Sequence, residues 1–155
     1  MIESVRIAEA PFDPEAELAA FRATLSESGG LVAFQGLVRG GTASDPVETL
    51  TLQHYPRVTE TGIAAAIEDA AGRWPLEAML VVHRVGDMRP GDPVVLVASA
   101  SRHRRAAFES ADFLMDFLKS RAMFWKYETR DGVRHWIEPR AQDYDDAGRW
   151  DIASP

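Results

Sequence analysis

The feature that most constrains the fold of this chain is an expected hairpin near its C-terminus. Residues 124–138 read FWKYETRDGVRHWIE, two runs of strand-forming residues joined by Asp131 and Gly132. An Asp-Gly pair between such runs is a strong signal for a two-residue β-turn. A second pair of strands is expected at LEAMLVVHRVG and PVVLVASA, because the DMRPGD stretch between them is rich in turn residues. Antiparallel hairpins therefore set the fold class.

Helices are expected between these strands. Asp13 is a suitable N-cap and Pro14 a suitable first helical residue for a helix over residues 13–27. A second helix is expected after Pro56, and the longest over about residues 102–121, with Ser101 as its N-cap. The stretch GGLVAFQGLVR is continuously apolar and predicts a buried strand, followed by a mobile loop from Gly40. The sequence predicts a single α+β domain with a mostly antiparallel sheet.

Composition excludes several functions. The chain has 155 residues and a net charge of −7, which disfavours a nucleic-acid or acidic-membrane partner. No apolar run is long enough to span a bilayer and no signal peptide is visible, so a cytoplasmic location is expected. The chain has no cysteine, which excludes disulfides and a cysteine nucleophile, and its four scattered histidines predict no metal site.

Two clusters of cationic residues suggest a ligand. Residues 102–105 read RHRR at the start of the longest helix, where a bound phosphate would explain cations at the unfavourable end of the helix dipole. Solvated arginines are an equally good explanation. Lys119 and Lys126 bracket the apolar run AMFW, which indicates either a frayed helix end or a pocket for an anion. Arg39, at a strand end beside the Gly-Gly loop, is either a clamp or a solvated residue.

Distance along the helix separates the two clusters. His103 and Lys119 are sixteen residues apart, so an unbroken helix places them about 24 Å from each other. They can share one small-molecule site only if a two-fold dimer sets two such helices antiparallel. The dimer then becomes part of the site.

Several longer motifs resemble one family. FQGLVRG, LTLQHYPRVTE, HRVGDMRPGD, SRHRRAAFES and LKSRAMFWKYE resemble, in the same order, the large catalytic subunit of molybdopterin synthase, the MoaE family. The resemblance extends over roughly residues 30–140. It implies an α/β-hammerhead fold over residues 1–140, and it leaves residues 141–155 as an acidic C-terminal tail that we expect to be flexible.

The resemblance also implies a function. Members of this family form a central homodimer within a heterotetramer, with a small ubiquitin-like subunit at each end. The C-terminal Gly-Gly thiocarboxylate of that subunit donates sulfur to cyclic pyranopterin monophosphate, and two rounds give the dithiolene of molybdopterin. No permanently bound cofactor and no metal are implied. The absence of cysteine agrees with this scheme, since the sulfur arrives on the partner.

The family's functional residues can be carried over one by one. Lys119 falls on the essential lysine and Lys126 on the second lysine. The residues that fall on the family's substrate-binding positions, besides the two lysines, are Leu37, Val38, Arg39, His103, Arg104, Tyr127 and Glu128. Two ammonium groups beside Phe124 and Trp125 should depress each other's pKa, which suits acid–base or acyl chemistry. A non-catalytic docking module for a sulfur-carrier protein, or a phosphometabolite-binding regulatory domain, remain as alternatives.

Overall fold

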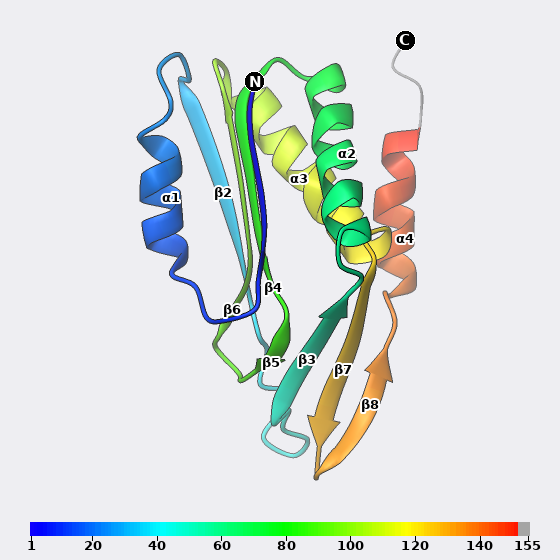
Figure 1. The fold of residues 1–155 in the computed structure, drawn as a ribbon. Coiled ribbons are helices and arrows are strands. Elements are labelled where there is room, and N and C mark those ends of the chain that lie inside the picture. The colour runs from blue at the N-terminus through cyan, green and yellow to red at the C-terminus, as the bar shows by residue number, and fades with distance from the viewer. Residues whose placement is uncertain (152–155) are drawn as a thin grey trace.

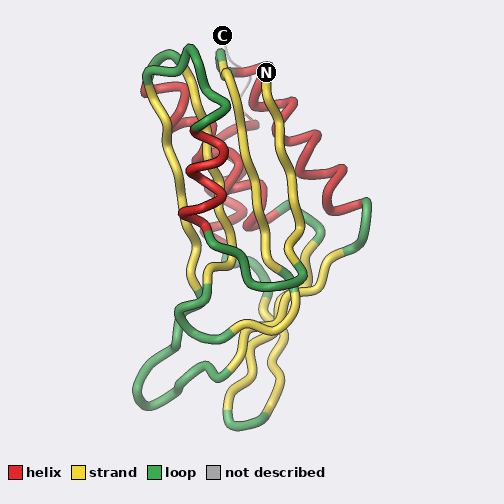
Figure 2. Tube along the Cα trace, turned by 60° about the vertical axis from the view of Figure 1, so that its left-hand side comes forward, coloured by secondary structure: helices red, strands yellow, loops and turns green. Residues whose placement is uncertain are grey.

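The computed structural model describes residues 1–151 and contains two four-stranded sheets (Figures 1 and 2). The first sheet has the order β1 (Ile2–Ala8), β4 (Leu76–Arg84), β6 (Pro93–Ser101) and β2 (Gly30–Leu37). Strand β1 pairs with β4 in parallel, and the other two pairs are antiparallel. The α+β class and the mostly antiparallel pairing are therefore confirmed, with the strands divided between two sheets.

Helices cover both faces of the first sheet, which explains its continuously apolar central strands. Helix α1 (Pro14–Arg22) lies on one face, and α2 (Val58–Arg73) and α3 (Arg104–Ser120) lie on the other (Figure 1). Along β4, alternate residues enter different cores: Leu80 packs on the α1 side, and Val81 packs on the side of α2 and α3.

The second sheet extends beyond one end of the first (Figure 1). Its order is β5 (Gly86–Met88), β3 (Thr49–His54), β7 (Phe124–Arg130) and β8 (Val133–Ile137), and every pair is antiparallel. The β7–β8 hairpin is confirmed. Its turn residues Asp131 and Gly132 have φ angles of 49° and 72°, the positive values that a two-residue hairpin turn requires.

The predicted N-cap residue was correct for helix α1 and wrong for helix α3. The Asp13 carboxylate accepts hydrogen bonds from the Glu15 and Ala16 amides at 3.0 and 3.2 Å, as expected of an N-cap. The N-cap of α3 is His103 rather than Ser101, and its side chain makes no capping bond. Ser101 is still part of β6, and its hydroxyl donates to the Pro75 carbonyl at 2.8 Å instead.

Strand β2 is not the buried strand that its apolar sequence predicted. It lies at the edge of the first sheet, and Phe34 and Leu37 are 43% and 58% exposed. An apolar strand at a sheet edge indicates that another surface covers it in the assembled protein. Phe108 on α3 is exposed as well.

The C-terminal segment is not the flexible tail that we expected. Residues 141–151 form α4 (Ala141–Gly148) and the short 3₁₀ helix η1 (Arg149–Asp151), which dock beside α3 (Figure 1). Arg149 donates to Asp112 and Asp116 at 2.7 and 2.8 Å. The Trp150 ring packs edge-on against Trp74 and Phe113. The acidic composition concealed these two anchoring residues; residues 152–155 lie outside the described part.

No helix within residues 1–151 is long and apolar enough to cross a membrane.

Candidate active site

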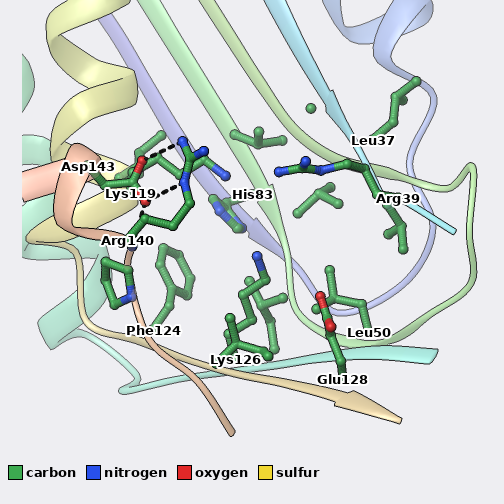
Figure 3. A pocket seen from close by; sticks show the side chains of 18 of the residues that line it. Leu37, Arg39, Leu50, His83, Lys119, Phe124, Lys126, Glu128, Arg140 and Asp143 are labelled. Carbon is green, nitrogen blue, oxygen red and sulfur yellow. Dashed lines mark hydrogen bonds and ion pairs between the residues drawn. The ribbon is translucent and has the colours of Figure 1, made fainter. Parts of the chain in front are cut away.

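A cavity of about 450 Å³ opens where the end of α3, the second sheet and the end of β2 meet (Figure 3). Its walls combine apolar residues, such as Leu50 on β3 and Phe124 on β7, with cationic ones. A concave site with apolar walls and a few converging charged groups is the usual form of a small-molecule pocket. Six of the predicted site residues line it: Leu37, Val38, Arg39, Lys119, Lys126 and Glu128.

Both lysines of the chain lie in this pocket. The sequence contains fifteen arginines and only two lysines, and both lysines line the cavity. Lys119 comes from the last turn of α3, and Lys126 comes from the middle of β7. The ion pair drawn in Figure 3 joins Arg140 and Asp143, and neither ammonium group is paired with the residues shown there. The two lysines are thus held close to each other with their charges available to a ligand.

The environment of Lys126 disfavours its charge. Burial lowers the pKa of Lys126 first, and the positive charges of Lys119 and Arg39 lower it further. Glu128, two residues along the same strand, opposes the shift. For Lys126, the direction of this shift agrees with the expected depression of the lysine pKa. An amine that loses its proton more easily is better suited to proton transfer near neutral pH.

Strand alternation decides which β7 residues enter the pocket. Phe124, Lys126 and Glu128 line the cavity, as period-two alternation requires. Tyr127 points to the other face, where its ring lies edge-on to Trp136 at 5.1 Å and beneath the Arg134 guanidinium at 4.1 Å. The Tyr127 side chain therefore does not line the pocket of its own chain, and its place among the substrate-binding residues stays a prediction.

His103 and Arg104 also lie away from the pocket. They are at the N-terminal end of α3, and this helix is continuous from Arg104 to Ser120. The pocket lies at its other end, beside Lys119. The condition on which the shared-dimer hypothesis rested, an unbroken helix, is therefore met. The structure contains a single chain, so the second half of such a site stays a prediction.

Arg39 and the loop after it are well anchored. The Val38 amide donates to the Asp92 carbonyl at 3.0 Å, and Val47 donates to Gly40 across the loop at 2.9 Å. Gly41 has a φ of 72°, and a Cβ there would lie 2.5 Å from the Asp45 carbonyl oxygen. Only glycine allows this tight loop. The mobile loop expected at residues 40–44 is instead folded onto Pro46 through a β-bridge with Gly41.

Salt bridges fix the carboxylates at the pocket. Glu128 accepts from Arg130 at 2.9 Å, and Arg130 also contacts Asp45 of the 40–46 loop at 2.6 Å. Asp143 accepts from the Arg140 backbone amide at 2.9 Å and from its guanidinium at 3.1 Å. These contacts, together with the positive charge of Lys119, hold the pKa of Asp143 below its usual range. Two of the three carboxylates that line the pocket, Glu128 and Asp143, are thus each paired with an arginine, and the third, Glu138, is exposed.

Among the residues of this pocket that sequence reasoning did not single out are His83, Arg140 and Asp143. His83 lies within an expected strand, where a histidine carries no local functional signal, and the other two fall at the boundary of the expected flexible tail. The strand register that brings the end of β4 to the cavity is a tertiary property that no local pattern indicates. Capping of α4 by Asp143 could have been recognised, since an acidic residue in a first helical turn is favourable.

His83 is neutral in this environment. Its ring is buried and stacks on Phe124, with ring centroids 4.1 Å apart. Burial, followed by the charges of Lys119 and Lys126, lowers its pKa to about 4, although a hydrogen bond to the Arg84 carbonyl opposes the shift.

The described residues offer no metal site. Within residues 1–151, no group of three or more histidine and acidic side chains is arranged to hold a metal ion.

Fold and site together define an α+β protein with a cationic small-molecule pocket built around two lysines. The family model described as "MoaE protein" matches residues 7–121, so the chain belongs to the MoaE family and the resemblance seen in the sequence is confirmed.

Curated relatives carry one name. The molybdopterin synthase catalytic subunit of Mesorhizobium japonicum is 45% identical over 153 residues, which cover 97% of this chain and 95% of the relative. That of Escherichia coli K12 is 45% identical over 124 residues, covering 80% and 83%.

Solved structures agree with the sequence relatives. A molybdopterin biosynthesis MoaE protein from Burkholderia ambifaria is 38% identical, with a TM-score of 0.82 over 99% of this chain and 100% of that one. Molybdopterin synthase from Staphylococcus aureus is 27% identical, with a TM-score of 0.77 over 84% and 94% of the two chains.

The low pKa of His83 predicts an acid-sensitive fold. Between its folded pKa of about 4 and the ordinary value of 6.5, the unfolded chain binds the proton and the folded chain does not. The free energy of unfolding should therefore fall by about 3 kcal/mol as the pH drops through this window. Urea denaturation of wild type and His83→Gln between pH 7.5 and 4 measures the effect. The variant lacks this component of the pH dependence, and parallel curves for the two proteins would contradict the assignment.

Proposed function

We propose that this chain is the catalytic subunit of a molybdopterin synthase. It would take sulfur from the C-terminal thiocarboxylate of a small ubiquitin-like subunit and transfer it to cyclic pyranopterin monophosphate, in the cytoplasm. The observation that carries the proposal is the convergence of both lysines of the chain with Arg39 in one cavity. Family membership and the names of the curated relatives support it.

The charge of the pocket suits the proposed substrates. A thiocarboxylate and a phosphate monoester are both anions, and the cavity offers Lys119, Lys126 and Arg39 as cationic donors. The carboxylates of Glu128 and Asp143 do not cancel these charges, since each is paired with its own arginine. The apolar walls lower the local dielectric and strengthen each contact with an anion.

The proposed reaction requires one lysine that transfers a proton and one that stays charged. The thiocarboxylate sulfur forms a bond to a carbon of the pterin side chain, and the bond from that carbon to an oxygen substituent breaks. The oxygen substituent leaves as an oxyanion or takes up a proton as it leaves. The resulting thioester is cleaved by water, which leaves a carboxylate on the small subunit and a thiol on the pterin. One lysine is needed as a proton donor or acceptor, and the other as a fixed cation beside the anion. We assign Lys119 the central role and Lys126 the supporting one.

Completion of the site requires a second copy of this chain. His103 and Arg104 begin α3, and Lys119 is in its last turn, so one chain cannot bring all three to one small molecule. In a two-fold dimer with antiparallel α3 helices, the start of one helix lies beside the end of the other. His103 and Arg104 of one copy would then bind the phosphate of a substrate held by the lysines of the other copy.

The first test is a reconstitution. Purified chain is mixed with thiocarboxylated small subunit and cyclic pyranopterin monophosphate, and dithiolene formation is followed. Because Lys119 falls on the family's essential lysine, Lys119→Ala should lower the rate about 100-fold or more, with a smaller loss in Lys126→Ala. Arg22→Ala, which removes an exposed cation from α1, is the control and should keep the wild-type rate. A wild-type chain that binds the small subunit but forms no product would instead indicate a docking module.

The shared site predicts complementation between two inactive variants. Arg104→Ala and Lys119→Ala should each be impaired alone, since every site then lacks one residue. When the two are co-expressed, a mixed dimer carries one site with both substitutions and one intact site, so about a quarter of all sites regain activity. Dithiolene formation by the co-purified mixture measures the recovery. If the mixture is no more active than the separate variants, Arg104 and Lys119 serve the same chain or different functions.

A further inference from the structure

His83 occupies a part of the pocket for which the proposed function has no role. It lies near the end of β4 in the first sheet, and its side chain lines the same cavity as Lys119 and Lys126 (Figure 3). A histidine buried only for packing would have both ring nitrogens engaged or excluded from solvent. The contacts of the two nitrogens therefore distinguish a packing role from a binding role.

One ring nitrogen is fixed as a donor. The Nδ1 atom of His83 lies 3.0 Å from the carbonyl oxygen of Arg84. A carbonyl oxygen can only accept, so Nδ1 carries the proton. Because the ring is neutral, as its pKa of about 4 requires near neutral pH, Nε2 has no proton and presents a lone pair.

The other nitrogen is open to the cavity. Only Nδ1 of His83 takes part in the hydrogen bonds of the described residues. Within the same residues, no fully buried side-chain nitrogen or oxygen lacks a partner. Since Nε2 has no partner there, it must be reached by solvent, and the surface that His83 shares with solvent is the pocket. Stacking on Phe124 holds the ring plane, so the direction of the lone pair is fixed.

An acceptor of this kind is scarce in the pocket. Lysine and arginine side chains are donors only and suit the anionic parts of a ligand. Of the carboxylates that line it, Glu128 and Asp143 accept from Arg130 and Arg140, and Glu138 is exposed and carries a negative charge, so none is a neutral buried acceptor. A pterin ring also carries N–H groups, and burying one without an acceptor costs binding affinity. His83 supplies a neutral acceptor whose lone pair does not cancel the cationic field.

We propose that Nε2 of His83 accepts a hydrogen bond from an N–H group of the pterin ring and so orients the ring beside the two lysines. This inference rests on the proposed function, since it assigns a contact to the same substrate. His83 binds the uncharged ring, whereas the lysines, Arg39 and the second copy's His103 and Arg104 bind the anionic groups. Recognition of the ring and of the phosphate is thus divided between separate residues.

Two substitutions separate the two nitrogens. The side-chain amide of His83→Asn can place its N–H where Nδ1 lies, which keeps the bond to Arg84 and removes the acceptor. The longer His83→Gln can place its amide oxygen near the Nε2 position, which restores the acceptor. Binding to the full-length wild type and both variants is measured by calorimetry, with unsubstituted pterin and inorganic phosphate as separate probes.

The proposal predicts a selective loss. Pterin should bind about tenfold more weakly to His83→Asn and nearly as tightly as wild type to His83→Gln, with phosphate affinity the same in all three. Equal pterin affinity in all three proteins overturns the proposal. So does an equal loss of pterin and phosphate binding in both variants, which assigns His83 to packing alone. A wild type that binds phosphate but no pterin overturns the proposed substrate as well, whereas failure confined to the variants leaves it standing.

Nitrogen NMR of the wild type gives an independent readout. In the free protein the His83 ring should show one protonated and one bare nitrogen, and saturating pterin should shift the signal of the bare nitrogen. A spectrum in which Nε2 is the protonated nitrogen contradicts the inference directly.

Discussion

The repulsion between two ammonium groups in one cavity is the constraint around which this structure is arranged. Lys119 is placed in the last turn of α3, where the negative end of the helix dipole favours a cation. Lys126 is carried by a strand that is hydrogen-bonded on both sides, by β3 and β8, so the position of its backbone is fixed. The free energy needed to hold these charges together comes from the buried cores on either side of β4 and β6. A bound anion would relieve the repulsion, which is why such a site is primed for one.

Much of the fold could be predicted because it depends on local chemistry. The Asp13 cap and the Asp131–Gly132 turn follow from side chains and dihedral angles within a few residues of each other. The edge position of β2 could not be predicted in this way. An apolar sequence is expected whether a neighbouring strand, a helix or another copy covers the strand. Only the strand order β1-β4-β6-β2 shows that β2 lies at the edge of its sheet.

The same division holds for the site. Lys119 and Lys126 were found because they flank an apolar run, and Arg39 because it ends a strand; family resemblance then separated these residues from solvated cations. His83 and Asp143 enter the pocket through tertiary register and helix docking, which no short stretch of sequence encodes. Tyr127 lies one residue from Lys126, yet strand alternation turns its side chain to the other face of β7, so proximity in sequence alone does not place it in the pocket.

The most direct test of the account is the pKa of Lys126 in the folded protein. Because the chain has only two lysines, carbon NMR of a protein labelled at lysine resolves each side chain through a pH titration. The account predicts that Lys126 titrates below an ordinary lysine and that its pKa rises when Lys119→Gln removes the neighbouring charge. If Lys126 titrates as a solvated lysine does, and Lys119→Gln leaves it unchanged, then the two ammonium groups do not share one desolvated pocket.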